Sequence, residues 1–590
     1  MSADLLIAIA VALGKSLVYA LFAMNLAVIL TWADRRQGAM IQDRVGPNRA
    51  VVFLPGKVAA LGALLPALAV GALVLWWTTQ TEFGESSRIG LAVLFSQLAI
   101  LTTWVTGLSI AGRIRVRGVK SSFDLFVRGL GDPRLFVAAG LALHAVTLAV
   151  GVMTRGMAEG ELFAEIGFRS GAALFAFVVV GGGLYAANSL ARQPSVGLRL
   201  AGLLHPVADG IKSIFKEDIV PPAADRVVHA LAPLISFFPA LIVMGVIPLG
   251  DRLCLGQNGG LESLLQPLGA TCSGKTFSLQ LIDLDVGLLF FFALGGTGII
   301  GAALAGWASN SKYSLLGGLR AASQMVSYEV TMGLTLIGAL MIYGSLRVDQ
   351  MIEWQARNTW GVFVQPVAFV MFFAAAVAES KRIPFDLPEG ESEIVAGYYT
   401  EYSGMKFAMF FFAEYVAVVT SSALMVAMFF GGWDLPFLER SGLHLALGET
   451  VWLDLALPHL VVVLLGVVAF MGKVLLLCWL QLLIRWTLPR FRYDQLMNLC
   501  WRKLLPWSLV NILVTGLVMM AVATGGTFAE QVLRQVAQYT KLLVVVASVA
   551  ATVALVVFLL KPVGHRRTVL SSSAKYAEMF GSTPTGSMGA

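Results

Sequence analysis

The chain has 590 residues, of which 57% are hydrophobic and 13% are charged, and its formal net charge at pH 7 is +7. Soluble globular proteins have about 25% charged residues, so this chain has too few to cover a soluble body of its length. The composition argues against a soluble enzyme, a disordered chain, a secreted disulfide scaffold and a nucleic-acid-binding domain, and favours a protein that crosses a membrane several times.

Apolar stretches long enough to cross about 30 Å of hydrocarbon recur along the sequence. A helix satisfies its own backbone hydrogen bonds in lipid, so each stretch predicts a spanning helix. The thirteen predicted spans are 5–32, 58–78, 89–112, 135–153, 171–190, 226–249, 283–306, 321–345, 362–379, 405–430, 457–484, 506–523 and 541–561. The expected fold is all-α, a polytopic transmembrane helical bundle with about 13 spanning helices.

The loop charges predict an orientation. Basic residues gather on cytoplasmic loops of membrane proteins. If the N-terminus lies outside, the basic loops at 35–49, 113–134, 312–320, 485–503 and 561–567 all lie inside, and glutamates near 82–85 and 159–165 lie outside. We therefore expect an outer N-terminus and a cytoplasmic C-terminus.

The four cysteines form no Cys-x-x-Cys pair or Cys/His cluster, and no glycine-rich phosphate motif is present. The chain is therefore expected to hold no metal, iron–sulfur cluster or nucleotide of its own. Cys254 and Cys272 fall in an outer loop, where two interpretations stay open. They form a disulfide if that face is oxidising, or they are two free thiols.

Residues Leu203–Glu217 have apolar positions at helical spacing and charges elsewhere. This pattern predicts an amphipathic helix lying at the inner surface of the membrane. Its simplest role is that of a membrane-surface anchor.

Two inner segments carry charged residues next to a turn or a predicted span. Trp32–Ala50 is strongly basic and ends in a Gly-Pro-Asn turn, and its arginines either line a site or are solvated residues that set the orientation. Ser309–Val330 runs into an apolar helix that contains Glu329. A glutamate inside a span is a functional candidate, and the alternative is a structural pairing with a neighbouring arginine.

A third inner segment, Glu379–Tyr415, is rich in carboxylates. They are Glu379, Asp386, Glu389, Glu391, Glu393, Glu401 and Glu414, with Lys381, Arg382 and Lys406 as the only cations. Burial and mutual repulsion both raise carboxyl pKa values, so some of these groups should hold or share protons near neutral pH, as a proton relay requires. A solvated acidic loop is a serious alternative for Glu389, Glu391 and Glu393, and a weak one for Glu414, which follows an apolar run. Prolines at 384 and 388 forbid one continuous helix here, which leaves an ordered loop or a floppy one.

Five segments in order carry a resemblance: DRRQGAMIQDRVGPNR, HPVADGIKSIFKEDIVP, SKYSLLGGLRAASQMVSYEV, AESKRIPFDLPEGESEIVAGYYTEYSGMKFAMFFFAEY and PRFRYDQLMNLCWRKLLP. They resemble the H subunit of bacterial NADH–quinone oxidoreductase, respiratory complex I, the counterpart of mitochondrial subunit 1. The resemblance covers about 1–50 and 202–520. Asp34 stands where this family usually has Glu, and His205 stands where Gln is common.

The resemblance implies eight core spans at the heel of the complex, a quinone chamber shared with two peripheral subunits, and the first part of a proton pathway. On this basis the pathway residues are Glu329, Glu379, Glu401 and Glu414, with Glu389, Glu391 and Glu393 where chamber and pathway meet. The expected chamber or docking residues are Arg35, Arg36, Arg44, Arg49, Asp209, Lys216, Glu217, Arg320, Arg382 and Asp386.

The resemblance also implies a membrane component of a proton-translocating enzyme in the bacterial inner membrane, with quinone as substrate. This chain would carry no redox cofactor, and FMN and iron–sulfur clusters would lie on partner subunits. Expected partners are the peripheral quinone-site subunits on the inner face, small membrane subunits alongside and the lipid bilayer, with no nucleic acid. One alternative is a membrane subunit of an energy-converting hydrogenase, which uses no quinone. A secondary transporter is the other, but no repeated halves support it.

The resemblance divides the chain into four parts. Residues 1–53 form the first helix and basic loop, and 54–200 form an inserted four-helix segment. Residues 201–523 form the rest of the core, and 524–590 add a helix and a cytoplasmic tail. An insert with an even number of spans returns the chain to the inner side. A packing role is expected for both additions.

Overall fold

The computed structural model of the protein describes residues 3–42, 46–47, 50, 52–79, 195–198, 202–254, 276–447 and 450–524, together with residues 176, 179, 180, 184, 187 and 191. Predicted spans 89–112, 135–153 and 541–561 lie outside the described residues, and 171–190 is described at only five of its positions.

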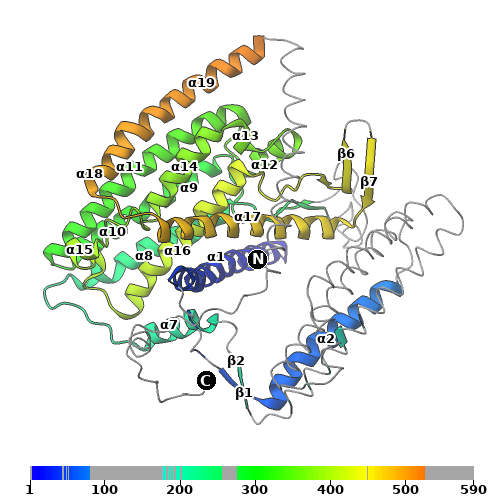
Figure 1. Ribbon diagram of the computed structural model, residues 1–590, viewed down its shortest axis with the longest axis horizontal. Coiled ribbons are helices and arrows are strands. Elements are labelled where there is room, and N and C mark those ends of the chain that lie inside the picture. The colour runs from blue at the N-terminus through cyan, green and yellow to red at the C-terminus, as the bar shows by residue number, and fades with distance from the viewer. Residues whose placement is uncertain are drawn as a thin grey trace, which may run out of the picture.

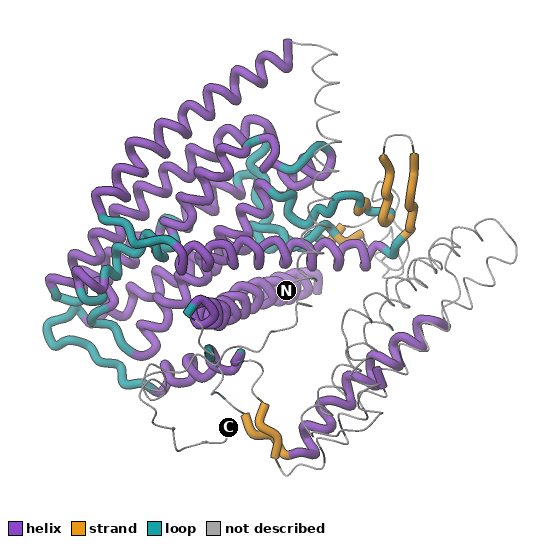
Figure 2. The backbone as a smooth tube through the Cα atoms, in the orientation of Figure 1, coloured by secondary structure: helices purple, strands orange, loops and turns teal. Residues whose placement is uncertain are grey.

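Helices dominate the described chain (Figures 1 and 2). The first elements are α1 (Ala3–Ile41), β1 (Val52–Pro55), α2 (Gly56–Thr79), β2 (Ser195–Leu198), α7 (Leu204–Phe215), α8 (Arg226–Ile242), the 3-10 helix η2 (Val243–Val246), β3 (Leu253–Cys254) and β4 (Thr276–Phe277). Next come α9 (Gly287–Gly295), α10 (Thr297–Ala308), α11 (Lys312–Tyr343), α12 (Val348–Arg357), α13 (Gly361–Val364), α14 (Pro366–Glu379), α15 (Glu391–Ile394), the 3-10 helix η4 (Gly397–Tyr399) and α16 (Gly404–Phe429). The last are β5 (Leu438–Glu439), β6 (Gly442–Leu447), β7 (Thr450–Ala456), α17 (His459–Thr487), α18 (Tyr493–Asn498), the π-helix η5 (Leu499–Leu504) and α19 (Leu505–Thr524).

Seven helical stretches among the described residues are long and apolar enough to cross a membrane. They are 11–39, 226–246, 287–308, 312–343, 404–429, 459–487 and 493–522. The shorter α14 is also apolar and lies inside the bundle. The prediction of an all-α membrane protein is confirmed.

Several helix boundaries differ from the prediction. The helix α1 continues to Ile41, so Arg35 and Arg36 lie on a helix rather than in a loop. Likewise α11 begins at Lys312 instead of 321, and the span predicted at 283–306 is two helices that meet at Gly296. Spans were predicted from hydropathy, whereas these helices continue beyond the apolar residues into polar sequence.

The core forms around α16, which is the most buried of the described spans, with 72% of its apolar window buried. It packs against α1, α8, α14 and α17, and α19 packs on α11 at the edge of the bundle (Figure 1). Only 11% of the window that includes α19 is buried, so its apolar side chains are left for lipid or a neighbouring subunit.

Hydrogen bonds from α1 define two opposite faces of the bundle. In the first half of α1, Tyr19 donates to the carbonyls of Ile247 at 3.0 Å and Leu279 at 2.6 Å. Near its end, Asp34 accepts from Tyr415 at 2.8 Å. We call the first end the Cys254 face, because β3 lies there, and the second the loop face, because it carries residues 380–403.

The Cys254 face is held by ion pairs and a disulfide. Arg347 pairs with Asp283 at 2.7 Å and with Asp349 at 3.1 Å. Cys254 is disulfide-bonded, which supports the disulfide interpretation for this cysteine, and Cys272 lies outside the described residues. Cys478 and Cys500 are buried free thiols.

Short strands, which were not predicted from the sequence, occur in three places. Strands β3 and β4 pair on the Cys254 face, and β5, β6 and β7 form a small antiparallel sheet. Strands β1 and β2 pair antiparallel, with Val52 opposite Leu198 and Pro55 opposite Ser195. This ribbon brings together the two ends of the predicted insert, and α2 starts directly from it (Figure 1).

Candidate functional site

The acidic loop between α14 and α16 is ordered. Gln324 of α11 donates to the carbonyls of Ala378 and Phe385, both at 2.8 Å. Phe385 stacks against Phe491, with ring centroids 5.4 Å apart. At Gly397, where φ is +56°, a Cβ would lie 1.7 Å from the carbonyl oxygen of Pro388, so only glycine allows this approach. Side-chain hydrogen bonds and close backbone packing therefore fix the loop.

Glu414 lies at the centre of the site, on α16, and its side chain is buried. One carboxyl oxygen accepts a short hydrogen bond from Tyr399, and the other lies 3.3 Å from a guanidinium nitrogen of Arg382. A buried carboxylate is stabilised only when it is paired in this way.

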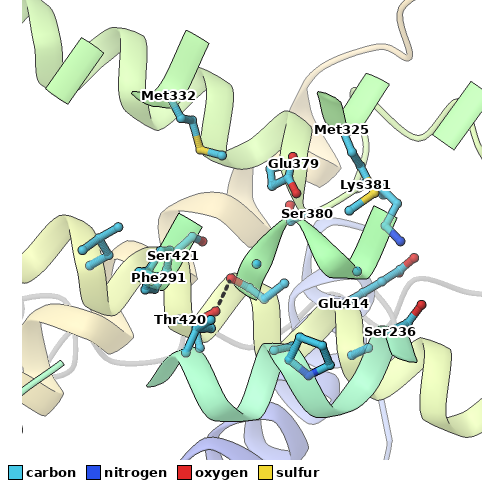
Figure 3. Close-up of a pocket in the computed structure, with 18 of the residues that line it drawn as sticks. Ser236, Phe291, Met325, Met332, Glu379, Ser380, Lys381, Glu414, Thr420 and Ser421 are labelled. Atoms are coloured by element: carbon cyan, nitrogen blue, oxygen red, sulfur yellow. Dashed lines mark hydrogen bonds between the residues drawn. The ribbon is translucent and has the colours of Figure 1, made fainter. Parts of the chain in front are cut away.

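A cavity adjoins this carboxylate. It is enclosed by α8, α9, α10, α11, α14 and α16, and Glu379, Lys381 and Glu414 line its polar end (Figure 3). Oε2 of Glu379 is buried without a hydrogen-bond partner among the described residues. Most of the remaining wall is apolar, so the carboxylates meet at one end of a largely hydrophobic space.

Glu329 lies beside this cavity, at the junction of α9 and α10. A Cβ on Gly296 would lie 2.8 Å from its carboxyl, so the glycine provides the space that the side chain occupies. The neighbouring Gly295 and Gly298 line the cavity. The structure thus brings Glu329, Glu379 and Glu414 to one region.

A groove on the loop face has a different character. Its first part, of about 880 Å³, lies between α1, α7 and α16, and Arg35 pairs there with Asp209 at 2.6 Å. Its second part, of about 780 Å³, continues along α1 to Asp34, Tyr415 and Trp486. Arg35 and Phe411 line both parts, so we treat them as one feature, the inner groove.

The helix α7 is the amphipathic helix that the sequence predicts. Its apolar residues Val207, Ile211 and Ile214 are exposed on one side, as expected of a helix lying on a membrane surface. Its polar residues Asp209 and Lys212, together with Lys216 directly after it, line the inner groove. The helix therefore places charged side chains in the inner groove and leaves its apolar side exposed.

Arg382 connects the inner groove with the cavity. Its guanidinium lies 4.0 Å from the ring centroid of Tyr415 and 5.3 Å from that of Phe411, and both rings line the groove. The same guanidinium pairs with Glu414, which lines the cavity. One side chain thus contacts residues that line each of the two spaces.

Two further carboxyls of the loop have shifted acidity. Burial, and then the nearby Glu414, raise the pKa of Glu389 to about 8. Burial and Glu414 also raise the pKa of Asp386 to about 6, although Arg490 pairs with it at 3.0 Å. Both groups change charge near neutral pH.

The other predicted residues that the structure describes do not line the cavity. Glu393 is largely exposed and pairs with Arg320 at 2.6 Å. Glu401 follows η4, and its backbone carbonyl lies 3.3 Å from a ring nitrogen of His229. Glu217 offers its backbone carbonyl to Ser403, and Lys216 lines the inner groove. Arg36 lies on α1, the side chain of Glu391 is not described, and Arg44 and Arg49 lie outside the described residues.

Several members of the site were not predicted from the sequence. Asp34 was noted only as a departure from the family, yet it is buried and accepts from Arg485, Trp486 and Tyr415. The sequence pattern does not distinguish Tyr398 and Tyr399, and it marks Lys381 only as a cation. The one sequence signal for these missed residues is the pair of adjacent tyrosines within the acidic segment.

The chain is similar to known proteins over most of its described part. The sequence profile of the NADH dehydrogenase family matches residues 172–516, a range that begins within the predicted insert. The chain is 45% identical to the NADH-quinone oxidoreductase H subunit 1 of Geobacter sulfurreducens over 317 residues, which is 54% of this chain and 82% of that protein. It is 44% identical to the H subunit 2 of Geobacter metallireducens over 317 residues, 54% of this chain and 83% of that protein. It is 40% identical to the H subunit 1 of Cytophaga hutchinsonii over 315 residues, 53% of this chain and 83% of that protein.

Proposed function

Because the chain belongs to the NADH dehydrogenase family, as a membrane component of NADH–quinone oxidoreductase similar to the H subunit, we propose that it helps to bind quinone and couples quinone reduction to proton movement. The observation that carries this proposal is the position of Arg382, which contacts the walls of the inner groove and pairs with Glu414 of the cavity.

The inner groove suits a quinone. A quinone has an apolar tail and two polar oxygens, and the groove combines Phe407, Phe411 and Phe412 with the ion pair of Arg35 and Asp209. It lies beside the exposed apolar face of α7, where a lipid-soluble molecule would enter from the bilayer. Partner subunits on the loop face would close the chamber and supply the electrons from their iron–sulfur clusters.

The cavity suits a proton pathway. Quinone reduction takes up two protons and passes through negatively charged states in the groove. A negative charge in the groove would attract the guanidinium of Arg382 and weaken its ion pair with Glu414. The carboxylate of Glu414 would then bind a proton more readily. Glu389 and Asp386, which titrate near neutral pH, can exchange protons with this end of the cavity.

The energies are compatible with work against a membrane potential. One pKa unit corresponds to about 1.4 kcal/mol, and moving one charge across 100 mV costs about 2.3 kcal/mol. A pKa change of about 2 units at a carboxyl is therefore enough to drive one proton against such a potential.

Replacement of Glu414 tests the proposal in the assembled complex. In Glu414→Gln, quinone reduction and proton pumping in proteoliposomes should both fall by about tenfold or more, a change of about 1.4 kcal/mol in barrier height. Glu439→Gln, on the Cys254 face, is the matched control and should keep both rates. Wild-type rates in Glu414→Gln, in a complex of normal composition, would refute the proposed pathway.

A further inference from the structure

Lys381 is a cation in an unusual position at the end of the cavity. It is the second residue after α14, and its backbone φ of +53° is in the left-handed region that non-glycine residues seldom adopt. Such a conformation persists only where the surrounding structure enforces it. The side chain lines the cavity together with Glu379 and Glu414 (Figure 3).

A continuous line of hydrogen bonds leads from Lys381 to Glu414. The ammonium nitrogen of Lys381 donates to the hydroxyl of Tyr398 at 3.0 Å. The hydroxyl of Tyr398 donates to that of Tyr399 at 2.7 Å, and Tyr399 donates to the carboxyl of Glu414. Both tyrosines are buried, so the line is shielded from bulk water.

We propose that Lys381 is a proton-carrying residue between Glu379 and Glu414, and that Tyr398 and Tyr399 conduct the proton between its amine and the Glu414 carboxyl. This inference rests on the proposed function. It adds Lys381 and the two tyrosines to the carboxylates of the proposed proton pathway. A hydroxyl can donate one hydrogen bond and accept another at the same time, which such conduction requires.

The transfer is balanced at each atom. An N–H bond of Lys381 breaks as an O–H bond forms on Tyr398, the original Tyr398 proton passes to Tyr399, and the original Tyr399 proton passes to Glu414. Lys381 is left as a neutral amine and Glu414 as a neutral acid, and both tyrosines remain protonated. Glu379, which lines the same cavity and has an oxygen without a partner among the described residues, then returns a proton to the amine.

The surroundings of Lys381 favour this exchange. Burial lowers the pKa of its ammonium, and the nearby Glu414, Glu379 and Glu389 oppose that shift, while Arg382 adds to it. The amine is therefore able to release its proton. Burial raises the pKa of both tyrosines well above the usual value, so the proton passes by a concerted shift and not through a tyrosinate.

A purely structural cation is the alternative, and Lys381→Arg separates the two. Arginine keeps the positive charge and the donor, but it does not deprotonate in proteins. If Lys381 carries protons, the assembled Lys381→Arg complex should lose about tenfold or more of its proton pumping and coupled quinone reduction. NADH oxidation with an artificial electron acceptor should stay normal, because it does not depend on this subunit.

Tyr399→Phe provides the second test, because it removes one oxygen and keeps the ring. It should slow pumping to a similar extent, and Tyr402→Phe, a buried tyrosine outside the line, should match the wild type. Wild-type pumping in either Lys381→Arg or Tyr399→Phe overturns the inference. If Glu414→Gln is inactive while these variants pump normally, the proposed function stands and only the role of Lys381 and the tyrosines is refuted. Wild-type pumping in Glu414→Gln refutes both the proposed function and this inference.

Discussion

At the scale of single residues, the same carboxyl group has different properties along one loop. Glu393 is exposed and paired with an arginine on the surface, whereas Glu414 is enclosed between Arg382 and Tyr399. Glu389 is held in its acid form up to about pH 8 by burial and by Glu414. The position in the fold, and not the residue type, decides which of them can exchange protons near neutral pH.

Glu389 makes stability depend on pH. Its pKa in the folded protein is about 8, above the value of about 4.3 in the unfolded chain. The stabilisation of the folded protein by this difference is complete below the unfolded pKa and is lost as pH rises through the folded pKa. The thermal midpoint of the purified complex should therefore fall from about pH 5 to about pH 9. In Glu389→Gln this fall should be smaller, as measured by differential scanning fluorimetry. An identical slope in both proteins would contradict the assigned pKa.

Asp34 ties α1 to α16 and α17. Because its side chain is buried and paired with Arg485, Asp34→Asn removes a charge whose partner stays behind, at a cost of about 3 kcal/mol. The thermal midpoint of the complex should drop clearly. The matched control is Asp285→Asn, which breaks an exposed ion pair with Arg347 and should leave the midpoint unchanged. Equal effects of the two substitutions would argue against a special role for Asp34.

The sequence predicted part of this site. The apolar run before Glu414 correctly indicated that this carboxyl is buried, and the gathering of carboxylates in one segment predicted that burial and mutual repulsion raise some of their pKa values, as they do for Asp386 and Glu389. It could not reveal the line through Lys381, Tyr398 and Tyr399, because a backbone turn at a non-glycine residue places the lysine there. Nor could it pair Asp34 with Arg485, which are 451 positions apart.

At the scale of elements, hydropathy located the spans but not the helix ends. The helix α1 continues past its apolar part to Ile41, and its polar last turns bring Asp34 and Arg35 to the inner groove. The junction of α9 and α10 has glycines that hydropathy scores as neutral. It is their lack of a side chain that makes room for Glu329.

Three polar residues contribute to the attachment of α19 at the edge of the bundle. Gln365, directly before α14, donates to Thr515 at 2.8 Å and accepts from Asn511 at 3.0 Å. Polar contacts between membrane helices are worth about 0.6 kcal/mol on average and up to about 1.7. Asn511→Ala should therefore weaken the packing of α19 by about 1 kcal/mol, measured as faster proteolysis or easier dissociation of this helix in detergent.

Leu513 provides the control, because it lies on the exposed side of α19. Leu513→Ala should have little effect on the same measurement. If both substitutions accelerate proteolysis equally, the polar contacts are not what holds the helix.

At the scale of the whole molecule, the two faces differ in their chemistry. The disulfide of Cys254 lies on the same face as the start of α1, and disulfides persist in oxidising compartments. We therefore expect this face to be outside, with the N-terminus. In sealed right-side-out vesicles, an impermeant thiol reagent should label Cys254 only after reduction. Labelling that requires inverted vesicles would reverse the assigned orientation.

The ribbon of β1 and β2 has a consequence for the architecture of this long chain. Its antiparallel pairing places Pro55 directly beside Ser195, so the chain leaves the bundle and returns to it at one point. Extra sequence added at such a point needs no rearrangement of the residues on either side. The predicted insert at 54–200 therefore joins the core at a single point. The same junction is a natural place to graft a tag or a reporter domain.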